Sequence, residues 1–246
     1  CSGLKKVTLH DVEIMNALSA SQVTDCYIRR STITKTATIP GNQDANGQPN
    51  RLVVLQSTIK EKLTSRAAKA WIGYSNLEES FLEGTLEIVK NEFNGLRSGN
   101  SNQAGIGIDL NGTNTTANIH NNKIHDFIHS HYGATNNTCI GIRISGNAKA
   151  SVFNNKIYKN RDGHPGGTET FVGMGIYVIS TADTKIFGNV FYDNGVDGGS
   201  DTGAANIWAP AQNVTIAYNA MTVYSTSGLV RGGAENHAMV NSTSGS

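Results

Sequence analysis

The sequence predicts an all-β protein built as a parallel β-solenoid, and three observations lead to that prediction. One short pattern, in which a polar residue lies between two apolar ones, returns along the 246-residue chain. Alternating apolar segments, each typical of a half-buried strand, precede the later copies of the pattern. No segment keeps a helical period over a dozen residues with capping residues at its ends.

The repeat is clearest where the chain reads HNNKIHDF, FNNKIYKN and FGNVFYDN, at residues 120–127, 153–160 and 187–194. Self-similarity at a long period is typical of solenoid proteins. The polar position is Asn in the later copies, Ser in two earlier ones, and Val12 in the earliest. In chain order these positions are 12, 31, 57, 91, 122, 155, 189 and 219. The sequence therefore predicts about eight coils, stacked at about 4.8 Å per coil.

The repeated asparagines predict an internal ladder. An unpaired buried amide costs about 1–3 kcal/mol, and stacked asparagines can satisfy one another by donating to one neighbour and accepting from the other. The alternative is that these residues mark turns, which asparagine also does well. The apolar residues that flank each copy on both sides favour the ladder.

A second strand precedes each of the later copies. These strands are GIGIDL (105–110), CIGIRI (139–144), GIYVI (175–179) and ANIWA (205–209). One segment departs from the strand pattern, because residues 57–71 combine Lys, Arg and Ala and allow a short surface helix as an alternative.

Composition excludes several classes of function. Lys plus Arg number 20 and Asp plus Glu number 19, so the chain lacks the basic surplus of a nucleic-acid-binding protein. No apolar run approaches the length of a membrane-spanning helix. Cys1, Cys26 and Cys139 are too few and too widely spaced for a disulfide framework or a CxxC metal pair. Cys1 leaves two interpretations open, a lipidated N-terminus and a domain cut from a longer chain.

The copies GIYV…TKIFGNVFYDN and GIRI…ASVFNNKIYKN resemble the repeat of the right-handed parallel β-helix superfamily, the pectin-lyase-like proteins. The resemblance covers nearly all of residues 1–246, as a single domain, and is clearest from 85 to 225. It implies three parallel sheets, right-handed winding, and polysaccharide as the partner, outside the cell, on its surface or on a virion. The superfamily includes lyases, hydrolases, epimerases, tailspikes and adhesins, so the resemblance implies no single reaction.

One outward column of the predicted strands is the candidate site. Aligning the strands by their inward isoleucines places Asp109, Arg143, Tyr177 and Trp208 in consecutive coils. Aromatic rings stack on sugar rings, and a guanidinium binds a carboxylate through its planar fork. The neighbouring positions predict a low floor beside the column, and they are Gly107, Gly141, Gly175 and Asn206. An ordinary solvated strand face is the alternative.

Three chemistries remain open for this column. In a lyase-like reaction on an acidic polysaccharide, Arg143 would neutralise the substrate carboxylate, and Tyr177 or His164 would act as the base. A glycoside hydrolase would need two carboxylates, such as Asp109 with Asp162 from a loop. The third interpretation is a non-catalytic binding or structural rod of the tailspike or adhesin type.

The loops 125–138, 158–173 and 192–204 lead into the same strands and would form one wall of the trough. Calcium is the metal hypothesis, through Asp193, Asp197 and Asp201, because Gly-rich bends with carboxylates suit a hard cation. Zinc held by His125, His129 and His131 is a weaker alternative, because their spacing matches no strict ligand pattern. No other cofactor is expected.

The ends of a solenoid expose strand edges that invite further pairing. Residues 1–14 read as a coil with no cap before them, and residues 228–246 begin another strand and then become small and polar. We therefore expect further domains or a homotrimer to cover the ends of the stack.

Overall fold

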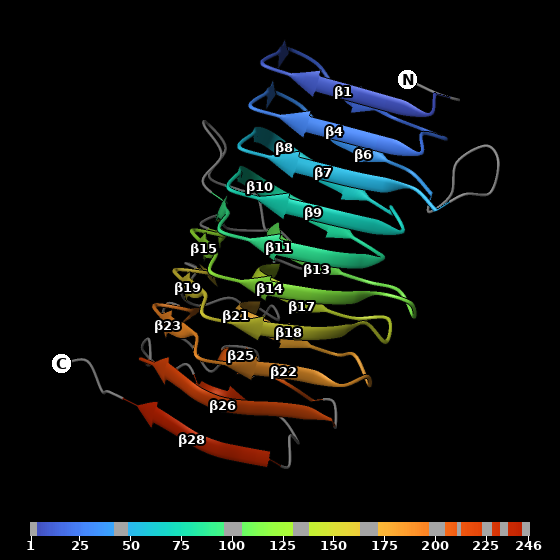
Figure 1. Ribbon diagram of the computed structural model, residues 1–246. Coiled ribbons are helices and arrows are strands. Elements are labelled where there is room, and N and C mark those ends of the chain that lie inside the picture. The colour runs from blue at the N-terminus through green and yellow to red at the C-terminus, as the bar shows by residue number, and fades with distance from the viewer. Residues whose placement is uncertain are drawn as a thin grey trace.

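A computed structural model of the chain describes residues 4–41, 49–95, 105–129, 138–162, 172–196, 205–210, 213–222, 228–231 and 236–242. All regular structure within these ranges is strand, and they contain no helix. Most strands join one long parallel sheet, in which the strands between the two ends pair with strands one coil earlier and one coil later. The all-β, parallel architecture is confirmed, and its regular stacking is consistent with a solenoid (Figure 1).

The strands form three columns, which we name faces A, B and C. Face A contains β1 (Lys6–His10), β4 (Asp25–Arg29), β7 (Arg51–Leu55), β9 (Lys69–Gly73), β11 (Thr85–Val89), β14 (Thr116–His120), β18 (Lys149–Phe153), β22 (Thr184–Phe187) and the first parts of β26 (Val214–Met221) and β28 (Asn236–Ser242). Face B contains β2 (Glu13–Ile14), β5 (Thr32–Ile33), the first parts of β8 (Thr58–Ser65) and β10 (Asn76–Leu82), then β12 (Glu92–Asn94), β15 (Lys123–His125), β19 (Lys156–Tyr158), β23 (Val190–Tyr192) and the ends of β26 and β28.

Face C contains β3 (Leu18–Ser19), β6 (Ala37–Ile39), the ends of β8 and β10, β13 (Gly105–Leu110), β17 (Thr138–Ile144), β21 (Val172–Val178), β25 (Ala205–Trp208) and β27 (Gly228–Arg231). Three short strands, β16 (Ile128–His129), β20 (Arg161–Asp162) and β24 (Gly195–Val196), form a small separate sheet. Figure 1 shows face A toward the viewer, with β1 and β28 at opposite ends of the stack.

The inward side chains of all three faces meet in one continuous apolar core. Ile88, Ile119, Val152 and Ile186 occupy the same position on successive face A strands, and all are fully buried. Burial of such apolar surface is the main favourable contribution to folding. Because the core takes one side of each strand, the other side is left for outward residues.

The bend between faces A and B has the same two-residue form in successive coils. Its first residue has a positive φ, which is 57° at Asn121, 56° at Asn154 and 64° at Gly188. Its second residue is the repeated polar residue, and the asparagines there bond to one another. The Nδ2 of Asn122 donates to the Oδ1 of Asn155 at 3.0 Å, and the Nδ2 of Asn155 donates to the Oδ1 of Asn189 at 2.9 Å.

One coil was missing from the sequence-based list of copies. Strand β9 pairs with β7 on one side and β11 on the other, so it forms a face A strand of its own. Ser75 is the repeated residue of this coil: its Oγ accepts from the backbone N–H of Ser57 at 3.1 Å, and its own N–H donates to Asn91 Oδ1 at 3.0 Å. The helix allowed for residues 57–71 is wrong, because β8 and β9 occupy most of that segment.

Candidate functional site

The four candidate residues of face C lie in one outward column. Asp109 pairs with Arg143, Arg143 with Tyr177, and Tyr177 with Trp208, on consecutive strands. The inward isoleucines on the N-terminal side of these residues lock this register, because a slip of one residue would expose them. The structure adds Phe81, which pairs with Asp109 from the preceding coil.

Arg143 and Asp109 form a two-point ion pair. The Nε of Arg143 donates to Oδ1 of Asp109 at 2.9 Å, and its Nη2 donates to Oδ2 at 2.6 Å. The Asp109 side chain is 9% exposed and that of Arg143 is 34% exposed. Hydrogen bonding to Asp109 raises the pKa of the Arg143 guanidinium above its ordinary value, against the opposing effect of burial. Asp109 therefore fixes the orientation of Arg143 and is itself largely sealed from solvent.

Tyr177 and Trp208 extend the column as a stacked aromatic pair. Their ring centroids are 5.1 Å apart, with the planes inclined by 28°. Both side chains are half-buried, so part of each ring remains accessible. Aromatic rings combine a large apolar surface with a polar edge. This pair can therefore support the apolar face of a sugar while the Tyr177 hydroxyl bonds to its polar groups.

The predicted glycine floor beside the column is wrong. A Cβ placed on Gly141 would lie 3.0 Å from both Asn160 Nδ2 and Ile157 Cγ2, which are inside the protein. Asn206, at the matching position of β25, is 1% exposed and accepts from the Nδ2 of Asn194 at 3.0 Å. The register keeps the same offset on both sides of Gly107 and Gly141, and the expected alternation is broken because Gly107 and Ile108 are both buried. These positions pack against the core and do not form the floor of a trough.

Several candidates lie outside the described residues, namely His131, His164, Asp197 and Asp201, as does most of each of the loops 125–138, 158–173 and 192–204. Asp162 lies in β20, where it pairs with His129 and Val196 of the small sheet. Asp193 is at a bend with a φ of 53°, next to the buried Asn194. The calcium hypothesis therefore stays a prediction. Among the described residues, no group of three His, Cys, Asp or Glu side chains is arranged to hold a metal ion.

Sequence reasoning named His125 only as a zinc candidate and missed the cluster that it forms on face B. His125 is 6% exposed, and its Nδ1 lies 2.7 Å from Asp126 Oδ2 while its Nε2 lies 3.1 Å from Glu92 Oε1. Its ring stacks on Tyr158, and Tyr158 stacks on Tyr192, with centroids 4.6 and 4.5 Å apart. Burial, followed by neighbouring charges, raises the pKa of Tyr158 to about 12. The aligned sequence letters His125, Tyr158 and Tyr192 in the three repeats quoted above were the available signal.

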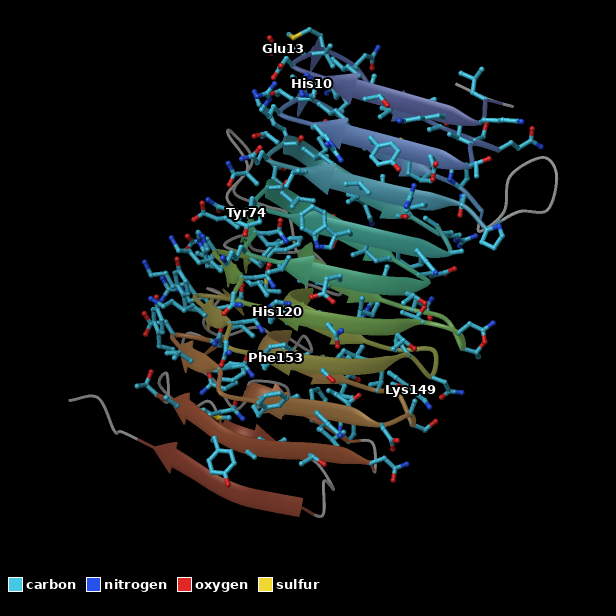
Figure 2. All side chains as sticks on the ribbon, viewed as in Figure 1. His10, Glu13, Tyr74, His120, Lys149 and Phe153 are labelled. Atoms are coloured by element: carbon cyan, nitrogen blue, oxygen red, sulfur yellow. The ribbon has the colours of Figure 1, made fainter. Side chains whose placement is uncertain are left out.

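A second stacked column lies on face A, where the rings of His120, Phe153 and Phe187 follow one another on successive coils. Figure 2 shows His120 and Phe153 projecting from that face. The His120 Nε2 contacts Glu87 Oε1, so both aromatic columns begin with a histidine beside a carboxylate from the preceding coil.

Comparisons of the chain with protein-family models, with curated proteins and with solved structures each found no match. The part of the chain that the structure describes contains no helix long and apolar enough to cross a membrane.

Proposed function

We propose that the chain is a right-handed parallel β-helix of the pectin-lyase-like type, in which the repeated asparagines act as an internal ladder. Two observations support this proposal. Strands pair in parallel with the next coil on all three faces. Asn91, Asn122, Asn155 and Asn189 each donate from Nδ2 to the Oδ1 of the next asparagine. The number of coils would be larger than eight, because β9 adds one between residues 57 and 91.

We further propose that this protein binds an acidic polysaccharide along face C and cleaves it by a lyase-like reaction, outside the cell or on a cell or virion surface. The observation that supports it most is the sequence of groups in one column: a guanidinium held by Asp109, followed by the Tyr177 and Trp208 rings. Asp109 accepts the single N–H of Nε and one of the two N–H groups of Nη2. Three N–H groups of Arg143 are then left for a substrate carboxylate.

The proposed reaction is β-elimination. A base removes the proton from the carbon beside the uronic acid carboxyl group, and Arg143 stabilises the charge that develops on the carboxylate. The electron pair forms a carbon–carbon double bond as the bond to the glycosidic oxygen breaks, and that oxygen takes up a proton. Tyr177 neighbours Arg143 in the column and is our candidate for the base. His164 is retained as an alternative base.

Absorbance at about 235 nm, where the unsaturated product absorbs, tests the chemistry directly. We would scan a panel of acidic polysaccharides with and without calcium, using the wild type, Tyr177→Phe and Arg143→Lys. Tyr177→Phe keeps the ring but removes the hydroxyl, and Arg143→Lys keeps the charge but removes the planar fork. Tyr192→Phe, on face B, is the matched control.

The expected result is a rise in absorbance on at least one substrate, lost in Tyr177→Phe, reduced in Arg143→Lys and unchanged in Tyr192→Phe. If Tyr177→Phe and Tyr192→Phe both react at the wild-type rate, Tyr177 is not the base. A flat trace for the wild type on every acidic polysaccharide, with calcium and without it, would contradict the lyase proposal.

A non-catalytic rod that binds glycans is the second candidate, and the ion pair also favours it. Both oxygens of Asp109 accept from Arg143, and the side chain is nearly sealed, so Asp109 has little access to a substrate proton. Its register neighbours, Phe81 and Arg143, supply no second carboxylate. A glycoside hydrolase would need such a pair of carboxylates, so we rank hydrolysis third, after the lyase-like reaction and the non-catalytic rod. Retained binding with no product would favour the rod.

A further inference from the structure

Face A carries a cavity that is separate from the face C column. The cavity has a volume of about 250 Å³ and lies across β7, β9, β11 and β14. Its walls are two adjacent outward columns of side chains. The first consists of Arg51, Lys69, Thr85 and Thr116, and the second of Val53, Trp71, Glu87 and Asn118. Pockets for drug-sized ligands are roughly 300–1,000 Å³, so this cavity suits a smaller group such as a single sugar ring.

The indole of Trp71 lies along its strand over a glycine. A Cβ placed on Gly73 would lie 3.0 Å from Cζ2 and 3.2 Å from Cη2 of Trp71, so the six-membered ring covers the space that a side chain would fill. Trp71 is half-buried, and it borders the cavity. A flat, partly exposed indole beside a cavity is a surface on which the apolar face of a sugar can stack.

The charges around the cavity divide it into two ends. Arg51 is oriented by Asp25, with 3.0 Å between Nε and Oδ1. Lys69, next to Arg51 in the register, forms no ion pair with any residue that the structure describes. Because Asp25 offsets the charge of Arg51, the uncompensated positive charge at this end is that of Lys69.

The other end presents a fixed carboxylate. Glu87 contacts His120 through Oε1 and accepts from Asn118 Nδ2 through Oε2 at 3.1 Å. Because both oxygens are held, the carboxylate keeps one orientation and can accept further hydrogen bonds from hydroxyl groups.

We propose that this face A cavity, centred on Trp71, is a binding site for an acidic saccharide. The sugar ring lies on the indole, its carboxylate or sulfate faces Lys69 and Arg51, and its hydroxyl groups face Glu87 and Asn118. The site goes beyond the proposed function, since it shares no residue with the face C column. It would hold a glycan chain to the rod whether or not face C performs chemistry.

The test uses the fact that the chain has two tryptophans. In a Trp208→Phe background, Trp71 is the only indole, so its emission reports on face A alone. The probe is hexagalacturonate, titrated at low ionic strength because exposed charges are screened by salt. Cellohexaose, which is neutral, serves as the charge control.

Two further variants in this background separate charge from shape. Lys69→Ala removes the unpaired cation. Gly73→Ala adds a methyl group that must push the Trp71 ring aside by a few tenths of an ångström, and we expect the strand to tolerate it because only a side chain must move. Lys149→Ala is the matched control. Lys149, labelled in Figure 2, occupies the same outward column as Lys69, two coils beyond Thr85, and does not line the cavity.

We expect a saturable change in Trp71 emission with hexagalacturonate, and an affinity at least about fivefold weaker for cellohexaose. Lys69→Ala and Gly73→Ala should each weaken the affinity for hexagalacturonate by about fivefold or more, and Lys149→Ala should leave it within twofold. The proposal is overturned if emission does not change, if cellohexaose binds equally well, or if Lys149→Ala weakens binding as much as Lys69→Ala. Circular dichroism establishes that each variant is folded.

Discussion

At the scale of single residues, Asn155 at an A–B bend connects three coils. Asn155 donates from Nδ2 to Ile119 O and Asn189 Oδ1, at 2.9 Å each. Its Oδ1 accepts from both the backbone N–H and the Nδ2 of Asn122, at 3.0 Å each. Asn155 is 1% exposed, so water cannot replace these partners once the side chain is removed.

We predict that Asn155→Ala lowers the free energy of unfolding by about 3–5 kcal/mol, because several buried groups lose a partner at once. Urea denaturation followed by circular dichroism measures this loss. The control is Asn154→Gly on the same bend. Asn154 is exposed and has a φ of 56°, so glycine should change stability by less than about 1 kcal/mol. Equal losses in both variants would mean that the stacked amides add little.

These residues were predictable from the sequence because a buried amide needs a partner and repetition supplies one. Ser75 was not found, although Ile72, Ser75 and Leu77 fit the pattern. The long period of the later copies hid a coil that has almost no loop. The Arg143–Asp109 ion pair also went unnoticed, since the letters alone could not show whether Arg143 would face its neighbour or a ligand.

At the scale of elements, strand β17 shows where alternation fails. Cys139 and Ile142 both belong to the core although they are three residues apart. The register between them omits Gly141. A Cβ there would lie 2.6 Å from the carbonyl oxygen of Gly175 on the next coil. Glycine is required because the backbones approach each other, and sequence periodicity cannot show such a close approach.

Gly141→Ala is predicted to destabilise the protein by about 2–3 kcal/mol, because backbone atoms of two coils must move apart. Gly73→Ala is the matched comparison, since its new methyl group meets only the Trp71 side chain. We expect the latter to cost less than about 1 kcal/mol. Thermal unfolding of the two variants gives the comparison. Similar melting temperatures for the two variants would contradict the close approach of the Gly141 and Gly175 backbones.

At the scale of the whole molecule, parallel stacking turns single outward positions into columns along the rod. The inward isoleucines fixed the face C column, so its register could be predicted. The face A site could not be predicted from the sequence. One of its coils, that of β9, is the coil that the repeat pattern missed between residues 57 and 91. The lyase chemistry, the calcium site, the homotrimer or capping domains and the location outside the cell stay predictions.

The central claim is that an acidic polysaccharide lies along face C, and Trp208 can report on it directly. In a Trp71→Phe variant Trp208 is the only indole, and its emission is followed during titration with hexagalacturonate. The account predicts a saturable change, preserved in Tyr177→Phe and weakened at least about fivefold in Arg143→Lys. Calorimetry on the same samples measures total binding. Heat of binding without any change in Trp208 emission, or no binding at all, would contradict the claim.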